Sequence, residues 1–335
     1  MKTNEKSELH VVMGAGQVGP ALARELVALG HRVRLVRRGP PTTEGQSIEW
    51  MRGDLGDPAF AAKACRGAAV VYNCTNPQLY HKWDQLLFPV ARGILDGAAQ
   101  AGAKLVVLDN LYMIGVPDKV PFDESAPMKP RSHKGELRKQ LVEQYLEAHA
   151  RGHVQWTSGR AADFFGPGAA EMSAFGDRLA QRMATGKAIE VFGNPHLPRS
   201  YSFIPDVARG LAILGTHSES WGKIWHLPVA WKGSTLELID AIAREVGLPA
   251  KTTRMPDFML SVAGLFSPMI GALREMTYQW KIPFVVDDRR FCTTFGVEAT
   301  PANEAVGQAA QAILQRIQEI RSGQAKPAAS RRQYA

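Results

Sequence analysis

The 335-residue sequence has little cysteine and no apolar run long enough to cross a membrane. Its three cysteines, Cys65, Cys74 and Cys292, are too few and too scattered for a disulfide framework or a metal site, which need paired ligands at fixed spacing. Scarce cysteine is typical of the reducing cytoplasm, where we expect this chain. The longest uncharged stretch, Phe258 to Leu273, falls short of the roughly 20 residues that span a bilayer.

Other signals for targeting or for nucleic-acid binding are missing as well. The first residues, MKTNEKSELHVVMG, contain no apolar run after the basic ones, so the sequence predicts no signal peptide or membrane anchor. The net charge of +8 is spread along the chain without a basic run interleaved with aromatics, and we expect no nucleic-acid partner. The tail KPAASRRQYA cannot bury a core, which predicts disorder over residues 323–335.

What the sequence does contain is an alternation of short apolar runs and amphipathic segments. HVVMG, HRVRLV, AAVVYNC and KLVVLDN have the composition of buried strands, and helices are predicted over residues 18–29, 83–101 and 132–150. This order predicts an α/β fold of the Rossmann type, a doubly wound parallel sheet. We expect a dinucleotide-binding domain over residues 1–165 and a smaller substrate-binding lobe over 166–322, with some segments returning to the main domain.

Two helix starts in the second half carry local signals. Ser234 with Glu237 three residues later predicts a capping box. Thr300 before Pro301 predicts the start of the last helix, because a threonine oxygen and a first-turn proline both suit the unpaired amides there.

The strongest motif is GAGQVG, which follows the first predicted strand and opens the first helix. Gly14 permits a tight turn, Gly16 lets the backbone approach a pyrophosphate, and Gly19 lets helix and strand pack closely. Together with Gln17 and Val18, these residues form the predicted phosphate cradle, where amides at the helix start hold the anion.

The residues after the second strand bear on which dinucleotide binds. NAD sites usually have an acidic residue there, whereas this chain has Arg37 and Arg38. Because a guanidinium pairs with a 2′-phosphate, the sequence favours NADP; the alternative is two solvated surface arginines. In RGDLGDP, Asp54 and Leu55 are expected at the adenine edge, unless the motif is only a turn.

With these motifs in view, the chain resembles the extended short-chain dehydrogenase/reductase superfamily, and most of all an atypical epimerase/dehydratase-like subgroup. The resemblance runs from about His10 to Ile320 through VMGAGQVG, RGDLGDP, VVYNCTNP, AGAKLVVLDNLYMIG, DFFGPG and RSYSFIPDVARG. It implies that the cofactor also contacts Cys74, Thr75 and Asn76, and that Phe164 faces the nicotinamide.

The family's catalytic residues are largely absent. A serine or threonine at the end of the fifth strand and a Tyr-x-x-x-Lys pair on the next helix are usual in the family. Here Asn110 stands in the first place, with Tyr112 two residues on, and Lys134 and Arg138 replace the pair. Lys134 is also the expected contact to the nicotinamide ribose.

Three interpretations of the acid remain open. Tyr112 supplies the proton, with Lys134 or Arg138 nearby to lower its pKa. Alternatively Lys134 is itself the acid, as in the aromatic ether reductases that KGELR resembles. In the third interpretation nothing replaces the tyrosine, and the fold only binds the cofactor. A solvated helix face would explain Lys134 and Arg138 equally well, and Tyr112 could be a core residue.

Four residues are expected to meet a small-molecule substrate. Tyr80 and His81 follow the fourth strand, where the family has a lid, although such residues also pack against helices. Asp163 could hold a substrate hydroxyl or amine, or cap a turn. Arg199 falls on the family arginine that grips a nucleotide-sugar diphosphate, or pairs with an acid such as Asp206.

The resemblance also implies a homodimer that pairs the helices beginning at Trp83 and at Ser132. The apolar residues Leu86, Leu87, Val90, Leu141 and Tyr145 suit that contact, or burial against the sheet. Altogether the sequence favours an NADP(H)-dependent oxidoreductase that reduces a carbonyl or related unsaturated group. The alternatives are a non-catalytic NADP-sensing protein and a nucleotide-sugar epimerase or dehydratase.

Overall fold

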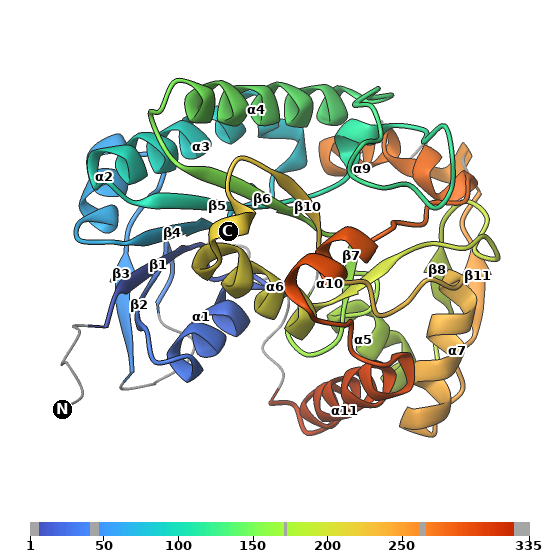
Figure 1. Ribbon diagram of the computed structural model, residues 1–335. Coiled ribbons are helices and arrows are strands. Elements are labelled where there is room, and N and C mark those ends of the chain that lie inside the picture. The colour runs from blue at the N-terminus through green and yellow to red at the C-terminus, as the bar shows by residue number, and fades with distance from the viewer. Residues whose placement is uncertain (1–6, 41–46, 171–172, 257, 261–265, 325–335) are drawn as a thin grey trace.

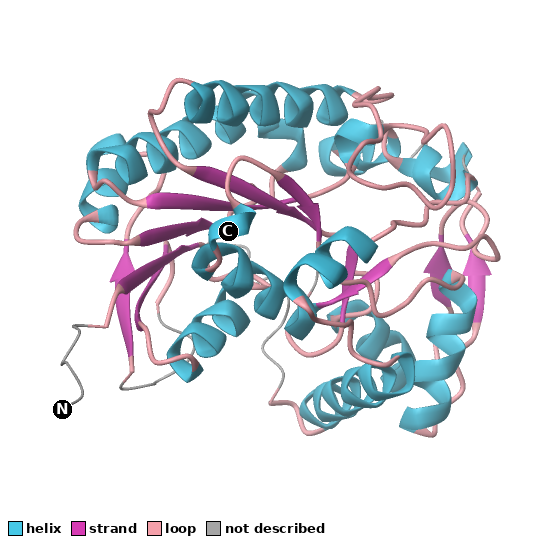
Figure 2. Cartoon of the chain, viewed as in Figure 1, coloured by secondary structure: helices cyan, strands magenta, loops and turns pink. Residues whose placement is uncertain are grey.

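In the computed structural model, a central parallel sheet lies between two layers of helices, with a second lobe beside it (Figures 1 and 2). The structure describes residues 7–40, 47–170, 173–256, 258–260 and 266–324. Of the tail predicted to be disordered, residues 325–335 lie outside the described residues. Within these ranges no helix has the length and apolar character needed to cross a membrane.

The central sheet has seven strands in the order β10-β6-β5-β4-β1-β2-β3, and every neighbouring pair is parallel. Its strands are β1 Leu9–Met13, β2 Arg32–Arg37, β3 Ile48–Arg52, β4 Val70–Asn73, β5 Lys104–Asp109, β6 Trp156–Arg160 and β10 Ile224–His226. Strands β1, β4 and β6 are buried along their whole length, as expected of strands covered on both faces. The predicted Rossmann-type α/β fold is confirmed.

Helices cover both faces of the sheet (Figure 1). One face carries α2 Pro58–Cys65, α3 Trp83–Gln100 and α4 His133–Ala150; the other carries α1 Gly19–Ala28 and α6 Ile204–Thr216. Leu87, Leu141 and Tyr145, three of the five residues of the predicted dimer stripe, are buried in the chain's own core between α3, α4 and the sheet. They fulfil the alternative interpretation, burial within the chain.

The second lobe contains two small parallel sheets and three longer helices. The sheets pair β7 Asp163–Phe165 with β9 Tyr201–Phe203, and β8 Ile189–Val191 with β11 Thr252–Arg254. Helices α5 Asp177–Thr185, α7 Thr235–Val246 and α11 Ala302–Arg321 enclose its core. The shorter elements of both parts of the molecule are α9 Pro268–Arg274, α10 Arg289–Phe295 and the 3-10 helices η1 Tyr80–Lys82, η2 Tyr112–Ile114, η3 Ser218–Ser220 and η4 Thr277–Lys281.

Of the two predicted helix starts, one is confirmed and the other is wrong. Ser234 and Glu237 form the capping box at the start of α7. Helix α11 begins at Ala302 after Pro301, and the Thr300 hydroxyl donates instead to Asp206 Oδ1 at 2.6 Å. Asp206 is fully buried, so its carboxylate needs donors, and both the backbone N–H and the hydroxyl of Thr300 supply them.

The topology creates a switch point at the carboxyl ends of β1 and β4. Strand β1 pairs with β2 on one side and with β4 on the other, so the connections that leave these strands diverge. Open α/β sheets bind ligands at such a switch point. The glycine-rich motif lies there, because Gly14 follows the last residue of β1.

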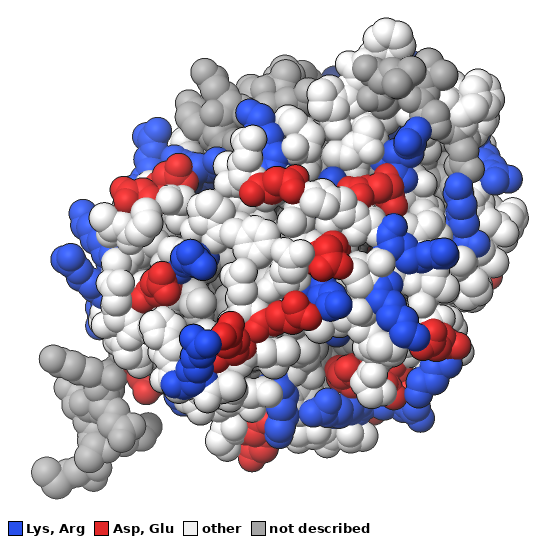
Figure 3. Space-filling view, turned by 90° about the horizontal axis from the view of Figure 1, so that it is seen from above, with Lys and Arg blue, Asp and Glu red and all other residues white. Residues whose placement is uncertain are grey.

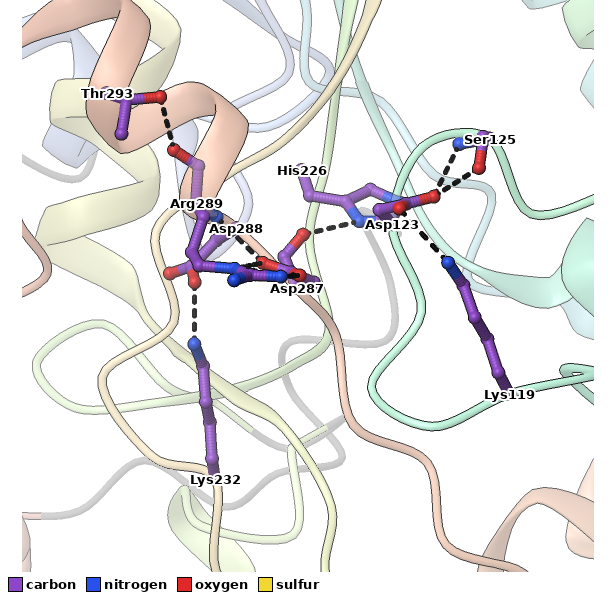
Figure 4. Close-up of polar contacts among 9 residues, drawn as sticks. All are labelled: Lys119, Asp123, Ser125, His226, Lys232, Asp287, Asp288, Arg289 and Thr293. Carbon is purple, nitrogen blue, oxygen red and sulfur yellow. Dashed lines mark hydrogen bonds and ion pairs between the residues drawn. The ribbon is translucent and has the colours of Figure 1, made fainter.

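A buried histidine, His226, ends the edge strand β10. Its Nδ1 donates to the carbonyl oxygen of Asp287 at 3.1 Å (Figure 4). Burial, and next the positive charge of Arg160, lower the pKa of His226 to about 3. A second buried histidine, His10, has its pKa lowered to about 4 by burial and by His31. Both imidazoles are therefore neutral in the folded chain near neutral pH.

We expect the free energy of unfolding to decrease as the pH falls below 6.5, the ordinary histidine pKa. Below this pH the histidines of the unfolded chain bind protons, whereas the two buried imidazoles stay neutral. Their contribution to the free energy of unfolding is therefore fully present above pH 6.5 and is lost as the pH falls toward about 4. Each histidine accounts for up to about 1.4 kcal/mol per pH unit. Urea unfolding measured at several pH values tests this, and His226→Gln should have the shallower slope. An equal slope in that variant would contradict the assignment.

Candidate functional site

The glycine-rich loop joins β1 to α1, and two of its glycines are required by the backbone itself. A methyl group at Gly19 would lie 1.9 Å from Gly14 O, and one at Gly14, whose φ is +100°, would lie 3.1 Å from Cys74 O. Gly16 differs, because it is exposed and a methyl group there would meet no atom within 4 Å. The space in front of Gly16 is therefore open to a ligand.

The start of α1 faces the same loop with unpaired backbone amides. Val18 is the N-cap and Pro20 lies in the first turn, and no side chain of the described residues caps the helix. Free N–H groups and the helix dipole together favour an anion at this point. The cradle thus fits the pyrophosphate of a dinucleotide, by its open space and by its donors.

A loop of the second lobe reaches across to this cradle. Gln17 Oε1 accepts a hydrogen bond of 3.0 Å from the backbone N–H of Ala170. A methyl group at Gly168 would lie 3.0 Å from Gln17 O, so the two backbones are in close contact. Phe164, at the base of this loop, is half-buried and its carbonyl accepts from the Ser173 hydroxyl at 2.6 Å. We call residues 166–170 the strap.

The residues predicted to meet the adenosine half lie at the ends of β2 and β3. Arg37 is half-buried, its Nη1 has no hydrogen-bond partner among the described residues, and burial lowers its pKa. Arg38 is exposed, and its carbonyl accepts from Arg52 Nε at 2.9 Å. Asp54 Oδ1 accepts from Gly56 N at 3.0 Å, which makes the turn that was the alternative interpretation. Leu55 is buried.

The segment after β4 is ordered by its own side chains. Asn73 Oδ1 accepts from Thr75 N at 3.0 Å and from Thr75 Oγ1 at 2.6 Å. Burial raises the pKa of Cys74 to about 12, so its thiol is protonated near neutral pH and is a poor nucleophile. Asn76 Oδ1 accepts from Arg138 Nη2 at 2.6 Å, which ties this segment to α4.

Tyr112 lies where η1, η2 and α4 meet. Its half-buried phenol oxygen is 3.5 Å from the Tyr80 hydroxyl, and its ring stacks on Trp83 with centroids 6.2 Å apart. Burial raises the pKa of Tyr112 well above its ordinary value, and Tyr80 and Asp163 add to this, while Arg138 opposes it. The phenol therefore keeps its proton over the neutral range.

Asn110 is used by the backbone. Its Oδ1 accepts from Tyr112 N at 3.0 Å and so shapes the turn that presents the phenol.

Lys134 and Arg138 are both buried, so the interpretation as a solvated helix face is wrong. Lys134 Nζ pairs with Glu275 Oε1, which arrives from the segment after α9. Arg138 Nη1 lies 3.3 Å from Asp109 Oδ1, and its guanidinium carbon lies 4.8 Å from the centre of the Trp83 ring. Each cation has a carboxylate partner because an unpaired buried charge would be costly.

Arg199 and Asp163 form an ion pair on the side of the second lobe. Arg199 Nη2 lies 2.9 Å from Asp163 Oδ2, and Nη1 donates to the carbonyl oxygen of Gln279 at 2.5 Å. Arg199 therefore does not pair with Asp206, which is bound to Arg209 and Thr300. Of the other predicted substrate residues, Tyr80 is buried beside Tyr112, whereas His81 is exposed.

Sequence reasoning missed Asp109, Glu275 and Gln279. Asp109 is the last residue of β5, so its place at the carboxyl edge of the sheet could have drawn attention. Glu275 is 141 positions from Lys134, and Gln279 is 80 from Arg199. No local pattern marks contacts at such separations.

The sheet order, the switch point and the glycine cradle agree with the extended short-chain dehydrogenase/reductase superfamily. Residues 10–227 match the NAD dependent epimerase/dehydratase family, so the chain belongs to that family, which confirms the resemblance. No curated protein matches the sequence significantly.

Several solved structures are similar to this chain in fold. Epimerase Mth375 of Methanothermobacter thermautotrophicus is 17% identical with a TM-score of 0.78, and the alignment covers 94% of this chain and 95% of that one. The UDP-glucose 4-epimerase of Thermus thermophilus, in complex with NAD, is 17% identical with a TM-score of 0.73, over 91% and 98%. The UDP-glucuronic acid 4-epimerase of Bacillus cereus, also with NAD, is 16% identical with a TM-score of 0.73, over 92% and 99%.

The prediction of NADP as the cofactor is wrong, because similar solved structures are complexes with NAD. They include the Thermus enzyme, WbmH of Bordetella bronchiseptica and MoeE5. The physical reason lies in the arginine side chain, which also stacks on planar rings and donates to neutral oxygens. Arg37 and Arg38 therefore do not by themselves require a 2′-phosphate.

Proposed function

We propose that this chain binds NAD and uses it to oxidise or reduce a carbon that carries a hydroxyl or carbonyl group in a small organic substrate. The observation that carries the proposal is the cradle: open space at Gly16 beside the uncapped start of α1. Arg37 Nη1, without a partner among the described residues, would donate to the adenosine ribose. When bound, NAD supplies hydride acceptance and donation.

We assign Tyr112 as the proton donor. Tyr112 is half-buried, and among the described residues the hydrogen-bond partner of its phenol is Tyr80, at a long 3.5 Å, so we expect the phenol to donate to a substrate oxygen. Its raised pKa keeps the proton in place until the substrate arrives. Lys134 is less suitable because Glu275 already holds its ammonium group, and Arg138 does not release a proton near neutral pH.

Arg138 and Asn76 are assigned positioning roles. The chain of contacts from Asp109 through Arg138 to Asn76 links the end of β5, the helix α4 and the segment after β4. These elements carry the residues nearest to the proposed reacting atoms. The network thus fixes the distance between the phenol and the cofactor cradle, and such orientation supplies much of an enzyme's rate.

Calorimetry with NAD and NADH, followed by a panel of hydroxy and carbonyl compounds, tests the function. We expect saturable binding of both oxidation states and a change in reduced-nicotinamide absorbance with at least one compound. The absence of any heat with either state would refute the proposal. Binding without turnover across a broad panel would favour the non-catalytic alternative.

A second candidate is a nucleotide-sugar epimerase or dehydratase. The names of similar structures favour it, since MoeE5 is described with UDP-glucose and two others are UDP-sugar 4-epimerases. In such a cycle the nicotinamide would be reduced and reoxidised without release. A sample that retains NAD through purification would support this type of cycle.

Assembly and location are also proposals. On the face in Figure 3, acidic and basic side chains of the described residues are interspersed, without one continuous basic area. Leu86 and Val90 of the predicted stripe are half-buried and Leu146 is exposed, so a dimer through α3 and α4 would use these residues. Light scattering that finds a monomer at micromolar concentration would exclude the dimer. A cytoplasmic location stays a prediction.

A further inference from the structure

The candidate site contains three buried cations, and each is bound to its own carboxylate. Lys134 pairs with Glu275, Arg138 with Asp109 at 3.3 Å, and Arg199 with Asp163 at 2.9 Å. Charges that are paired in this way have little attraction left for an anionic ligand. The charge balance of the site therefore bears on the net charge of its substrate.

A fourth buried cation, Arg160, is balanced as well. It ends β6 next to Asp109 in the register of the sheet. Asp109 and Glu124 act on it as the nearby negative charges, and both favour its charged form. Among the described residues, none of the four buried cations is left without an acidic neighbour.

Arg199 is enclosed on the remaining sides. Its side chain is only 4% exposed, and its second terminal nitrogen donates to Gln279 O at 2.5 Å. Its guanidinium carbon lies 4.9 Å from the centre of the Trp280 ring and 5.9 Å from that of Tyr201. Each terminal nitrogen thus donates one hydrogen bond, and Nε is buried without a partner among the described residues. The charge of Arg199 is balanced by Asp163, although its donors are not all used.

Asp163 is the exposed member of this pair. Its side chain is 39% exposed, against 4% for Arg199. Asp163 and Tyr112 each lie three residues beyond the end of one of two paired strands, β6 and β5, and Asp163 acts on Tyr112 as a negative charge. A ligand that reaches the phenol from this side meets a carboxylate before it meets the guanidinium.

Aromatic rings stack beside Tyr112. Tyr80 stacks on Trp83 with centroids 4.7 Å apart, and Trp83 stacks on Tyr112. Tyr80 and Trp83 are buried, so the half-buried Tyr112 is the ring of this stack that a substrate could reach.

We propose, on the basis of the proposed function, that the site selects an uncharged hydroxy or keto compound and rejects nucleoside diphosphates. Asp163 accepts a hydrogen bond from a substrate hydroxyl, and the carbonyl or hydroxyl at the reacting carbon meets Tyr112. A diphosphate would have to lie beside the Asp163 carboxylate and displace it from Arg199, which like-charge repulsion opposes. Asp163 is therefore the specificity-determining residue.

The test is a calorimetric titration of the NAD-loaded protein with UDP-glucose. For the wild type we expect no saturable binding below about 1 mM. Asp163→Asn removes the negative charge and releases Arg199, so its affinity for UDP-glucose should rise at least about tenfold. The matched control is Asp240→Asn, an exposed acid on α7, which should behave as the wild type does.

The outcomes separate this proposal from the proposed function. Micromolar binding of UDP-glucose to the wild type, abolished by Arg199→Met, would overturn the specificity proposal and leave NAD chemistry intact. Failure to bind NAD would overturn the proposed function itself. Should Asp163→Asn not fold, as judged by circular dichroism, the wild-type titration alone decides.

Discussion

Replacing Tyr112 by phenylalanine is expected to lower turnover by about 10²- to 10⁴-fold, the usual contribution of a positioned general acid. The substitution removes one oxygen and keeps the ring that stacks on Trp83, so affinity for NAD should be unchanged. Burial raises the pKa of Tyr112 well above 10.0, and the acid form is the active one. The wild-type rate of carbonyl reduction should therefore stay level with rising pH until beyond that value.

Lys134→Met is the informative comparison for this variant. If Tyr112 is the acid, loss of Lys134 costs stability through the unpaired Glu275 and affects the rate less than loss of the phenol does. Steady-state rates of both variants and their urea midpoints separate the two effects. Full turnover in Tyr112→Phe together with a strongly reduced turnover in Lys134→Met would identify Lys134 as the proton donor.

Gly16→Val is expected to weaken NAD binding by about 100-fold or more, equivalent to about 2.7 kcal/mol, without loss of stability. No atom of the described residues lies within 4 Å of a methyl group at this position, so the fold has room for a side chain. The space that the side chain takes is the space assigned to the pyrophosphate. Calorimetry with NAD and thermal unfolding without ligand measure the two properties.

Gly307→Val is the matched control for this substitution. Gly307 lies within α11 of the second lobe, and a methyl group there also meets nothing within 4 Å. This variant should bind NAD as the wild type does. Gly19→Ala should differ from both, because its methyl group would clash with Gly14 O and disturb the fold itself. Equal NAD affinity in Gly16→Val and Gly307→Val would place the cofactor elsewhere.

The layered fold was predictable because its signals are local. Strand β1 is apolar except for His10, and α1 begins at the third glycine of the motif that follows it, so hydrophobic pattern and glycine spacing agree. The capping box of α7 is equally local. The start of α11 was misplaced because Asp206, 94 residues away, captures the Thr300 hydroxyl. A tertiary contact there overrides the local preference.

The candidate site was predictable in its residues and less so in their partners. Tyr112, Lys134, Arg138 and Asp163 were identified near the ends of strands or the start of a helix, where ligands usually bind, and Arg199 through the family resemblance. Their charge partners are distant in sequence, so the electrical balance of the site emerged only from the fold. The prediction of NADP was wrong because it assumed that Arg37 and Arg38 bind a 2′-phosphate, whereas arginine can also stack on rings or donate to neutral oxygens.

The contact between Gln17 and Ala170 bears on how often the coenzyme is exchanged. Because the strap is hydrogen-bonded to the cradle, we expect NAD to leave only after this contact breaks, and therefore slowly. Electrons removed from a molecule in one half-reaction would then be handed back to the same molecule before the carrier departs. Slow release would thus favour the second candidate, a nucleotide-sugar epimerase or dehydratase, over net oxidation or reduction of the substrate.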